Sequence, residues 1–186
     1  MTELTAADRA DIETVVGFWK EAGPDAWFRK DTGFDDAFRA AHQDLHWRAA
    51  RRELDHWNVS PDGALALMIL LDQFPRNCFR GTAHMFATDP LARYHARLAV
   101  DAGYDQGVAP ELRTFIYLPF EHSEDMADQE RAVELLTPLG GRNLEYAIIH
   151  RDIIARFGRF PHRNRAFGRE TTAEEKAFLD EGGFAG

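Results

Sequence analysis

The sequence contains little cysteine and no long apolar run. Cys78 is the single cysteine among 186 residues, which excludes an internal disulfide framework and a cysteine-rich zinc site. The longest apolar run, residues 64–71, is far shorter than the roughly 20 residues that a helix needs to cross a bilayer. The acidic N-terminus lacks the basic and then apolar pattern of a signal peptide. We therefore expect a cytoplasmic protein that does not bind a membrane.

Positive charge is also scarce. Acidic residues number 31 and basic residues 22, of which 19 are arginine, so the formal net charge is −9. This balance argues against binding to nucleic acid or to an anionic membrane surface. The hydrophobic content of 45% is typical of a folded core, and the length fits one domain. We therefore predict a single domain over residues 1–186, with the glycine-rich residues 182–186 as a flexible tail.

Apolar residues recur at helical spacing, and no long stretch alternates apolar and polar residues as an amphipathic strand does. Turn residues such as Gly23 and Gly103 separate the helical patterns. Residues 64–71 are apolar on every side and are expected at the centre of the core. The predicted fold class is all-α, a single-domain array of about eight helices. Their ranges are 11–22, 34–54, 60–71, 90–102, 110–125, 126–136, 142–157 and 172–179.

The first candidate site lies at the end of the apolar helix. Asp72 follows a run of apolar residues, and a buried carboxylate must be paired or neutralised. Arg76 stands at the spacing of a helical ion pair, and Pro75 is expected to kink or end the helix. Asp72 therefore either forms a structural pair or orients an arginine toward a ligand. Asn77 and Arg80 complete the candidate ligand-binding residues of this segment.

The second candidate lies in an acidic segment, residues 121–130, which holds five carboxylates and neither lysine nor arginine. His122 lies among these carboxylates, so its pKa is expected to rise. A histidine with carboxylate neighbours can act as a general acid or base or as a metal ligand. Glu124 is the candidate carboxylate partner in catalysis. The acidic residues also suit the start of the following helix, where they would serve as caps.

The third candidate lies near the C-terminus. His150 falls in the middle of an apolar helical arc, as either a core histidine or a site residue. Between residues 151 and 169, six arginines accompany a single acid. Such a patch binds a carboxylate or a phosphate, or it pairs with the acidic segment. The candidate site residues here are His150, Arg159, His162, Arg163 and Asn164.

Three of these segments together resemble a known family. The motifs are LLDQFPRN at residues 70–77, YLPFEHSED at residues 117–125 and RFGRFPHRN at residues 156–164. In these motifs the sequence resembles the bacterial family called domain of unknown function 924, and the resemblance spans nearly the whole chain. Glu121 departs from the family pattern, which is less polar there. The resemblance implies a helical fold of the tetratricopeptide-like superhelical type, and it implies no established activity.

The three polar segments each begin at a proline that breaks or kinks a helix. We hypothesise that these helix ends converge on one pocket. Its arginines would bind the anionic group of a small ligand, while His122 or His162, with Glu124, would transfer protons. The enzyme form of this hypothesis is a hydrolase or lyase that acts on a small carboxylate or phosphate ester.

These segments could also serve only to join helices through buried ion pairs, and two further alternatives stay open at the level of the sequence. One is a non-catalytic module whose concave helical face binds a peptide or a partner protein. Its contact surface would include aromatic residues that otherwise form the core, namely Trp19, Trp27, Phe28, Trp47 and Trp57. The other is a metal site, although the Glu-x-x-His pairs of di-iron bundles are missing. Its ligands would be Glu121, His122, Glu124 and His150. We assign no metal and no cofactor.

Overall fold

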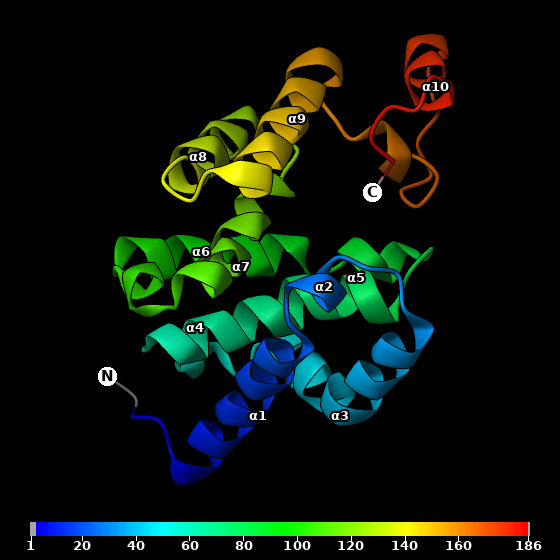
Figure 1. Ribbon diagram of the computed structural model, residues 1–186. Helices are drawn as coiled ribbons and strands as arrows, with labels where there is room; N and C mark the ends of the chain where they lie inside the picture. The colour runs from blue at the N-terminus through cyan, green and yellow to red at the C-terminus, as the bar shows by residue number, and fades with distance from the viewer. Residues whose placement is uncertain (1–2, 186) are drawn as a thin grey trace. The chain divides into compact units, whose positions relative to one another are not determined.

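The computed structural model describes residues 3–185, which form helices and connecting turns without any β-strand (Figure 1). This confirms the all-α prediction, whereas the tetratricopeptide-like superhelix stays a prediction. Within residues 3–185, no helix combines the length and the apolar character needed to span a membrane. Gly186, the last residue of the expected tail, lies outside the described residues.

The chain forms two compact units. The N-terminal unit comprises residues 3–80 and 84–119, and the C-terminal unit comprises residues 81–83 and 120–185. No glycine- or serine-rich linker marks the boundary after residue 119, because it falls at Pro119 inside a continuous helix. The expectation of a single domain stays a prediction.

The helices of the N-terminal unit follow the predicted ranges closely. Their bounds are α1 (Ala6–Ala22), α2 (Pro24–Trp27), α3 (Thr32–Ala50), α4 (Pro61–Met68), α5 (Phe74–Cys78), α6 (Asp89–Asp101) and α7 (Pro110–Glu121), whose last residues belong to the C-terminal unit. The sequence did not predict α2, because Gly23 and Pro24 mark the end of α1. Proline at the first turn also suits the start of a further helix. The helix predicted over residues 34–54 ends earlier, at Ala50.

The centre of the N-terminal unit is the segment predicted to be apolar on every side, residues 64–71, which is fully buried. Ahead of Pro75 the backbone forms a π-helical turn, Ile69–Gln73, which connects α4 directly to α5. Proline has no N–H to donate to the carbonyl of Leu71. The hydroxyl of Thr88 donates to that carbonyl oxygen instead, at 2.5 Å. From the sequence, Pro75 is expected to kink or end the helix. The structure accommodates it with one extra residue in a π-helical turn, and the helix continues.

The C-terminal unit buries fewer apolar side chains. Its helices are α8 (Met126–Leu136), α9 (Gly141–Phe157) and α10 (Ala173–Asp180), with a 3-10 turn at Pro161–Arg163. α8 and α9 lie side by side (Figure 1). The apolar cluster of the unit contains Ile153, Ile154 and Phe160, packed against the partly buried Met126, Phe157, Phe178 and Phe184. The position of the segment between α9 and α10 must therefore depend largely on polar contacts.

Candidate functional site

Asp72 has the burial and the arginine partner that the sequence predicted. Its side chain is completely buried, and Oδ1 lies 2.9 Å from Nη1 of Arg76. Arg76 also donates to both carboxylate oxygens of Asp89, at 2.8 and 3.0 Å, and to the carbonyl of Asp72. One guanidinium thus joins the π-helical turn to the first turn of α6. This arrangement accounts for the buried charge by pairing within the N-terminal unit.

Asn77 and Arg80 meet a carboxylate that sequence reasoning missed. Asn77 donates to Oδ1 of Asp35 at 3.1 Å, and Arg80 donates through Nε to Oδ2 at 2.8 Å. Asp35 is buried in the first turn of α3. The sequence offered only its position at a helix start, which is where acidic residues are common. The structure thus places Asp72, Arg76, Asn77 and Arg80 in two carboxylate–arginine groups that join helices, and their ligand-binding role stays a prediction.

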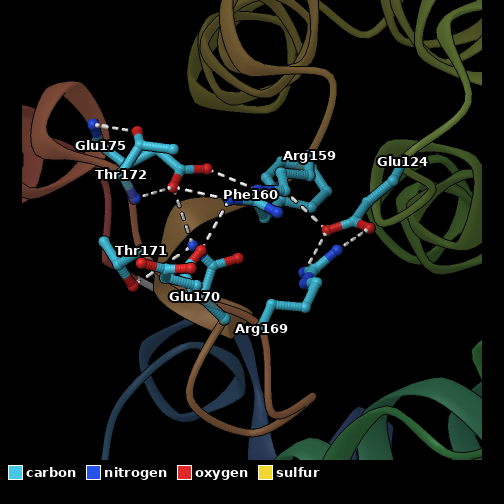
Figure 2. Close-up of polar contacts among 9 residues, drawn as sticks. Glu124, Arg159, Phe160, Arg169, Glu170, Thr171, Thr172 and Glu175 are labelled. Atoms are coloured by element: carbon cyan, nitrogen blue, oxygen red, sulfur yellow. Dashed lines mark hydrogen bonds and ion pairs between the residues drawn. The ribbon is translucent and has the colours of Figure 1, made fainter.

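Glu124 holds the segment that follows α9 (Figure 2). Its carboxylate accepts from Arg169 at 2.7 and 2.9 Å and from the backbone N–H of Phe160 at 2.8 Å. Burial raises the pKa of Glu124, but the bonds from Arg169 and Phe160 outweigh burial and lower that pKa below its usual value. Glu124 is therefore an ionised anchor near neutral pH. The proton-transfer role assigned to it from the sequence stays a prediction.

Glu175 organises a second polar group in this segment (Figure 2). Its oxygens accept from Arg159 at 2.5 and 2.8 Å, from Asn164 at 3.1 Å and from the N–H of Thr172 at 2.7 Å. These bonds, that from Arg159 foremost, lower the pKa of Glu175 to about 2. The capping pattern at residues 171–175 signals the contact with Thr172, but no sequence signal pairs Glu175 with Arg159. Arg159 and Asn164 are thus occupied by this buried carboxylate.

His150 lies at the centre of a third group in the C-terminal unit. It is 4% exposed on α9. Its Nδ1 lies 2.8 Å from the carbonyl oxygen of Tyr146 and 3.3 Å from Oε1 of the buried Glu121. Since a carbonyl oxygen only accepts, Nδ1 must carry the proton, and Nε2 of the neutral ring is left as an acceptor. A carboxylate and a carbonyl together therefore fix both the tautomer and the orientation of the ring.

Burial keeps the ring of His150 neutral, and nearby charge adds to this effect. Burial lowers the pKa of His150 to about 3, and positive charge on His122, Arg163 and His162 lowers it further, against the bond to Tyr146. The contact with Glu121 is therefore a hydrogen bond to a neutral ring at pH 7 rather than an ion pair. Arg163, His122 and His162 act on one side of this ring, and the carboxylate of Glu121 lies 3.3 Å from Nδ1.

The other histidines of the C-terminal unit surround this ring. The centroids of His122 and His150 are 6.2 Å apart. Arg163 is buried, donates to the carbonyl of His122 at 3.0 Å and stacks over Phe160, with its Cζ 4.5 Å from the ring centroid. The structure thus brings together four of the predicted site residues, namely His122, His150, His162 and Arg163, and Phe160 connects this group to Glu124. Their functional role stays a prediction.

Residues 182–185, expected as a tail, contribute to the same group. The ring of Phe184 lies 4.4 Å from that of His150 and 5.3 Å from that of His162, between centroids. The backbone N–H of Gly183 donates to the carbonyl of Phe178 at 2.9 Å. The sequence did not predict this contact, because glycines dominate the segment and hide the single aromatic residue.

The structure also bears on two of the alternatives, the aromatic contact surface and the metal site. Trp19, Trp27 and Trp57 are buried and belong to the core, whereas Phe28 is 65% exposed and Trp47 is half-buried. Among residues 3–185, no three histidine, cysteine, aspartate or glutamate side chains are grouped so that they could hold a metal ion. The residue set Glu121, His122, Glu124 and His150 therefore does not form such a group in the described part of the chain.

Comparison with known proteins gives a family and a fold. A family model described as "Bacterial protein of unknown function (DUF924)" matches residues 15–183. The solved structure of a protein of unknown function from Agrobacterium tumefaciens is similar to this chain, with 59% sequence identity and a TM-score of 0.92. The match covers 94% of this chain and 99% of that chain. No curated protein matches the sequence.

Proposed function

This chain belongs to the DUF924 family of bacterial proteins of unknown function, and we propose that it binds a small anion, a carboxylate or a phosphate ester, at His150 in the C-terminal unit. The observation that carries the proposal is the state of His150. It is a buried, neutral ring held by Tyr146 and Glu121, with Nε2 left as an acceptor and with Arg163, His122 and His162 in the same group.

The nearby charge favours the binding of an anion. Burial is the main reason that His150 stays neutral. The charge of Arg163, with that of His122 or His162 when either is protonated, would stabilise a negative group placed beside the ring, on the side away from the carboxylate of Glu121. Arginine is suited to a carboxylate or a phosphate because it presents parallel N–H donors. An anion at this place would in turn raise the pKa of His150, since it would compensate part of this positive charge. Binding is therefore expected to be coupled to proton uptake.

Acid–base chemistry is the enzymatic form of the proposal. With Nδ1 tied to Tyr146 and Glu121, Nε2 of His150 is the atom that would accept a proton from a bound molecule or from water. His122 and His162 would supply the proton that a leaving group needs. Such a pair of roles fits a hydrolase or lyase that acts on a small carboxylate or phosphate ester. Glu121 is a positioning residue here, because it acts through the orientation of His150.

Isothermal titration with inorganic phosphate and with acetate tests the proposal. We expect His150→Gln and Arg163→Gln to weaken binding by about tenfold or more, because each removes a partner of the anion. Arg165→Gln is the matched control, since Arg165 is exposed and two residues away. Thermal unfolding of each variant checks that it is folded. Equal binding by the wild type and the His150 variant would refute the proposal. Hydrolysis of p-nitrophenyl phosphate, lost in His150→Gln, would support the enzymatic form.

A non-catalytic peptide-binding module is the second candidate, and one feature of the N-terminal unit favours it. A half-open surface hollow of about 710 Å³ is lined by apolar and charged residues of α1, among them Ile12, Val16 and Lys20, and by residues 60–62 at the start of α4. A Cβ added to Gly17 would meet no atom within 4 Å. Gly17→Trp should therefore fill this hollow without disturbing the fold. If the module is correct, Gly17→Trp abolishes binding on a peptide array, whereas His150→Gln leaves it unchanged.

A further inference from the structure

The C-terminal turn places an aromatic ring directly against the histidines of the proposed site. Phe184 meets His150, His162 and Tyr146 edge to face, with centroid distances of 4.4, 5.3 and 6.3 Å. Edge-to-face contact is a favourable geometry for aromatic pairs. The position that Phe184 occupies is thus lined by three aromatic side chains of the same unit, and it adjoins the positively charged side chains beside His150.

The turn that carries Phe184 follows α10, and Phe184 packs there against the apolar cluster of the unit, a contact that its displacement would break. Gly182 has a φ of 85°, which favours glycine, and a Cβ on Gly183 would lie 2.5 Å from the carbonyl oxygen of Phe178. The bond from Gly183 to Phe178 ties this turn to α10. Phe184 itself stays partly exposed, while His150 beneath it is buried.

We propose that the ring of Phe184 occupies the place of an aromatic ring in the ligand, so that the site takes an aromatic carboxylate or an aryl phosphate and Phe184 is displaced when it binds. This inference depends on the proposed anion site at His150 and names the class of anion that fits it. The anionic group would face Arg163 and the histidines, and the aromatic ring would contact Tyr146, His150 and His162. A small anion without a ring would bind beside Phe184 and leave it in place.

Displacement makes a quantitative prediction. When a binding position is filled by a side chain for most of the time, the apparent affinity falls by the fraction of time in which it is open. Removal of the ring in Phe184→Ala is expected to tighten the binding of phenyl phosphate by about tenfold. The binding of inorganic phosphate should change less than about twofold, since it does not need the position of the ring.

Calorimetric titration of the full chain with phenyl phosphate and with inorganic phosphate tests the inference. Phe28→Ala is the matched control, because it removes an exposed phenylalanine from the N-terminal unit. If Phe184→Ala is unstable, Phe184→Leu keeps an apolar side chain in the turn and should still favour phenyl phosphate, by a smaller factor.

The outcomes separate the inference from the function on which it depends. If inorganic phosphate binds and requires His150, but Phe184→Ala weakens phenyl phosphate or leaves its affinity unchanged, the anion site stands and the displacement of Phe184 is wrong. If both ligands bind Phe184→Ala more tightly by the same factor, Phe184 merely covers the site and the aromatic specificity is wrong. If neither ligand binds any of the folded proteins, the anion site itself is wrong.

Discussion

Both units of this chain contain buried carboxylates, but the N-terminal unit surrounds them with many more apolar side chains than the C-terminal unit does. In the N-terminal unit, Asp72 stands at the end of a segment, residues 64–71, that is completely buried among other apolar side chains. In the C-terminal unit, the apolar cluster is small, and the carboxylates of Glu124 and Glu175 hold the segment between α9 and α10. The first unit is therefore stabilised mainly by apolar burial, and the second depends to a larger extent on charged hydrogen bonds.

This difference indicates that the C-terminal unit is better suited than the N-terminal unit to hold a binding or catalytic site. Polar side chains that are buried among few apolar ones need particular partners, and their arrangement fixes tautomers and charges rather than merely filling space. His150 illustrates the point, because its carbonyl and carboxylate partners set its tautomer. Asp72 and Arg76 illustrate the contrary case, since their contacts join the π-helical turn to α6.

The largest expected effect lies in the apolar core of the N-terminal unit. Phe74 is fully buried, stacks on His46 and meets Phe38 edge to face. We expect Phe74→Ala to lower the free energy of unfolding by about 3–5 kcal/mol, because it opens a cavity among rings that cannot close it. Urea denaturation measures the loss. Phe28→Ala, at an exposed ring, should cost less than about 1 kcal/mol, and similar losses in both variants would contradict the comparison.

The second effect lies in the polar network of the C-terminal unit. Glu175→Gln removes the charge that Arg159 and Asn164 share, and we expect a loss of about 2–3 kcal/mol on unfolding. Glu174→Gln is the control, because its pair with Arg156 is exposed and should be worth less than about 1 kcal/mol. Urea denaturation, followed by a probe in the C-terminal unit, compares the two. If both variants lose the same amount, charged contacts do not hold this unit.

A smaller effect concerns pH, and here the two units should behave alike. His46 in the N-terminal unit donates from Nδ1 to the carbonyl of Leu70, and burial lowers its pKa to about 4, as burial lowers that of His150 to about 3. The unfolded chain takes up these protons near pH 6.5, whereas the folded chain does not. Stability is therefore complete above about pH 6.5 and falls as the pH drops toward the folded values.

Each of these two histidines should cost about 2 kcal/mol between pH 7.5 and pH 5. Urea denaturation at pH 7.5 and at pH 5 measures the change in the free energy of unfolding. His46→Gln should remove the part of this change that comes from His46. Glu175 has the opposite sign, because its pKa is lowered, and its stabilisation is lost only below about pH 4.5. Stability that stays constant from pH 7.5 to pH 5 would contradict the neutral, buried state of both rings.

Sequence patterns predicted the helices well because helical spacing is a local property. They also predicted the burial of Asp72 and its partner Arg76, which lies four residues away. They missed Asp35 as the partner of Arg80 and Glu175 as the partner of Arg159, since both contacts join segments far apart in the chain. The patterns placed His150 on an apolar arc, but they did not reveal that Glu121 and Tyr146 fix its proton, because that depends on tertiary contacts.

Nitrogen-15 NMR of His150 tests the central claim most directly. The ring should be protonated at Nδ1 and unprotonated at Nε2 at pH 7, should titrate near pH 3, and should titrate at a higher pH when phosphate is added. Glu121→Gln should change this titration, because the carboxylate partner of Nδ1 is removed. A ring that titrates near pH 6.5, carries its proton on Nε2 and does not respond to phosphate would contradict the account of this site.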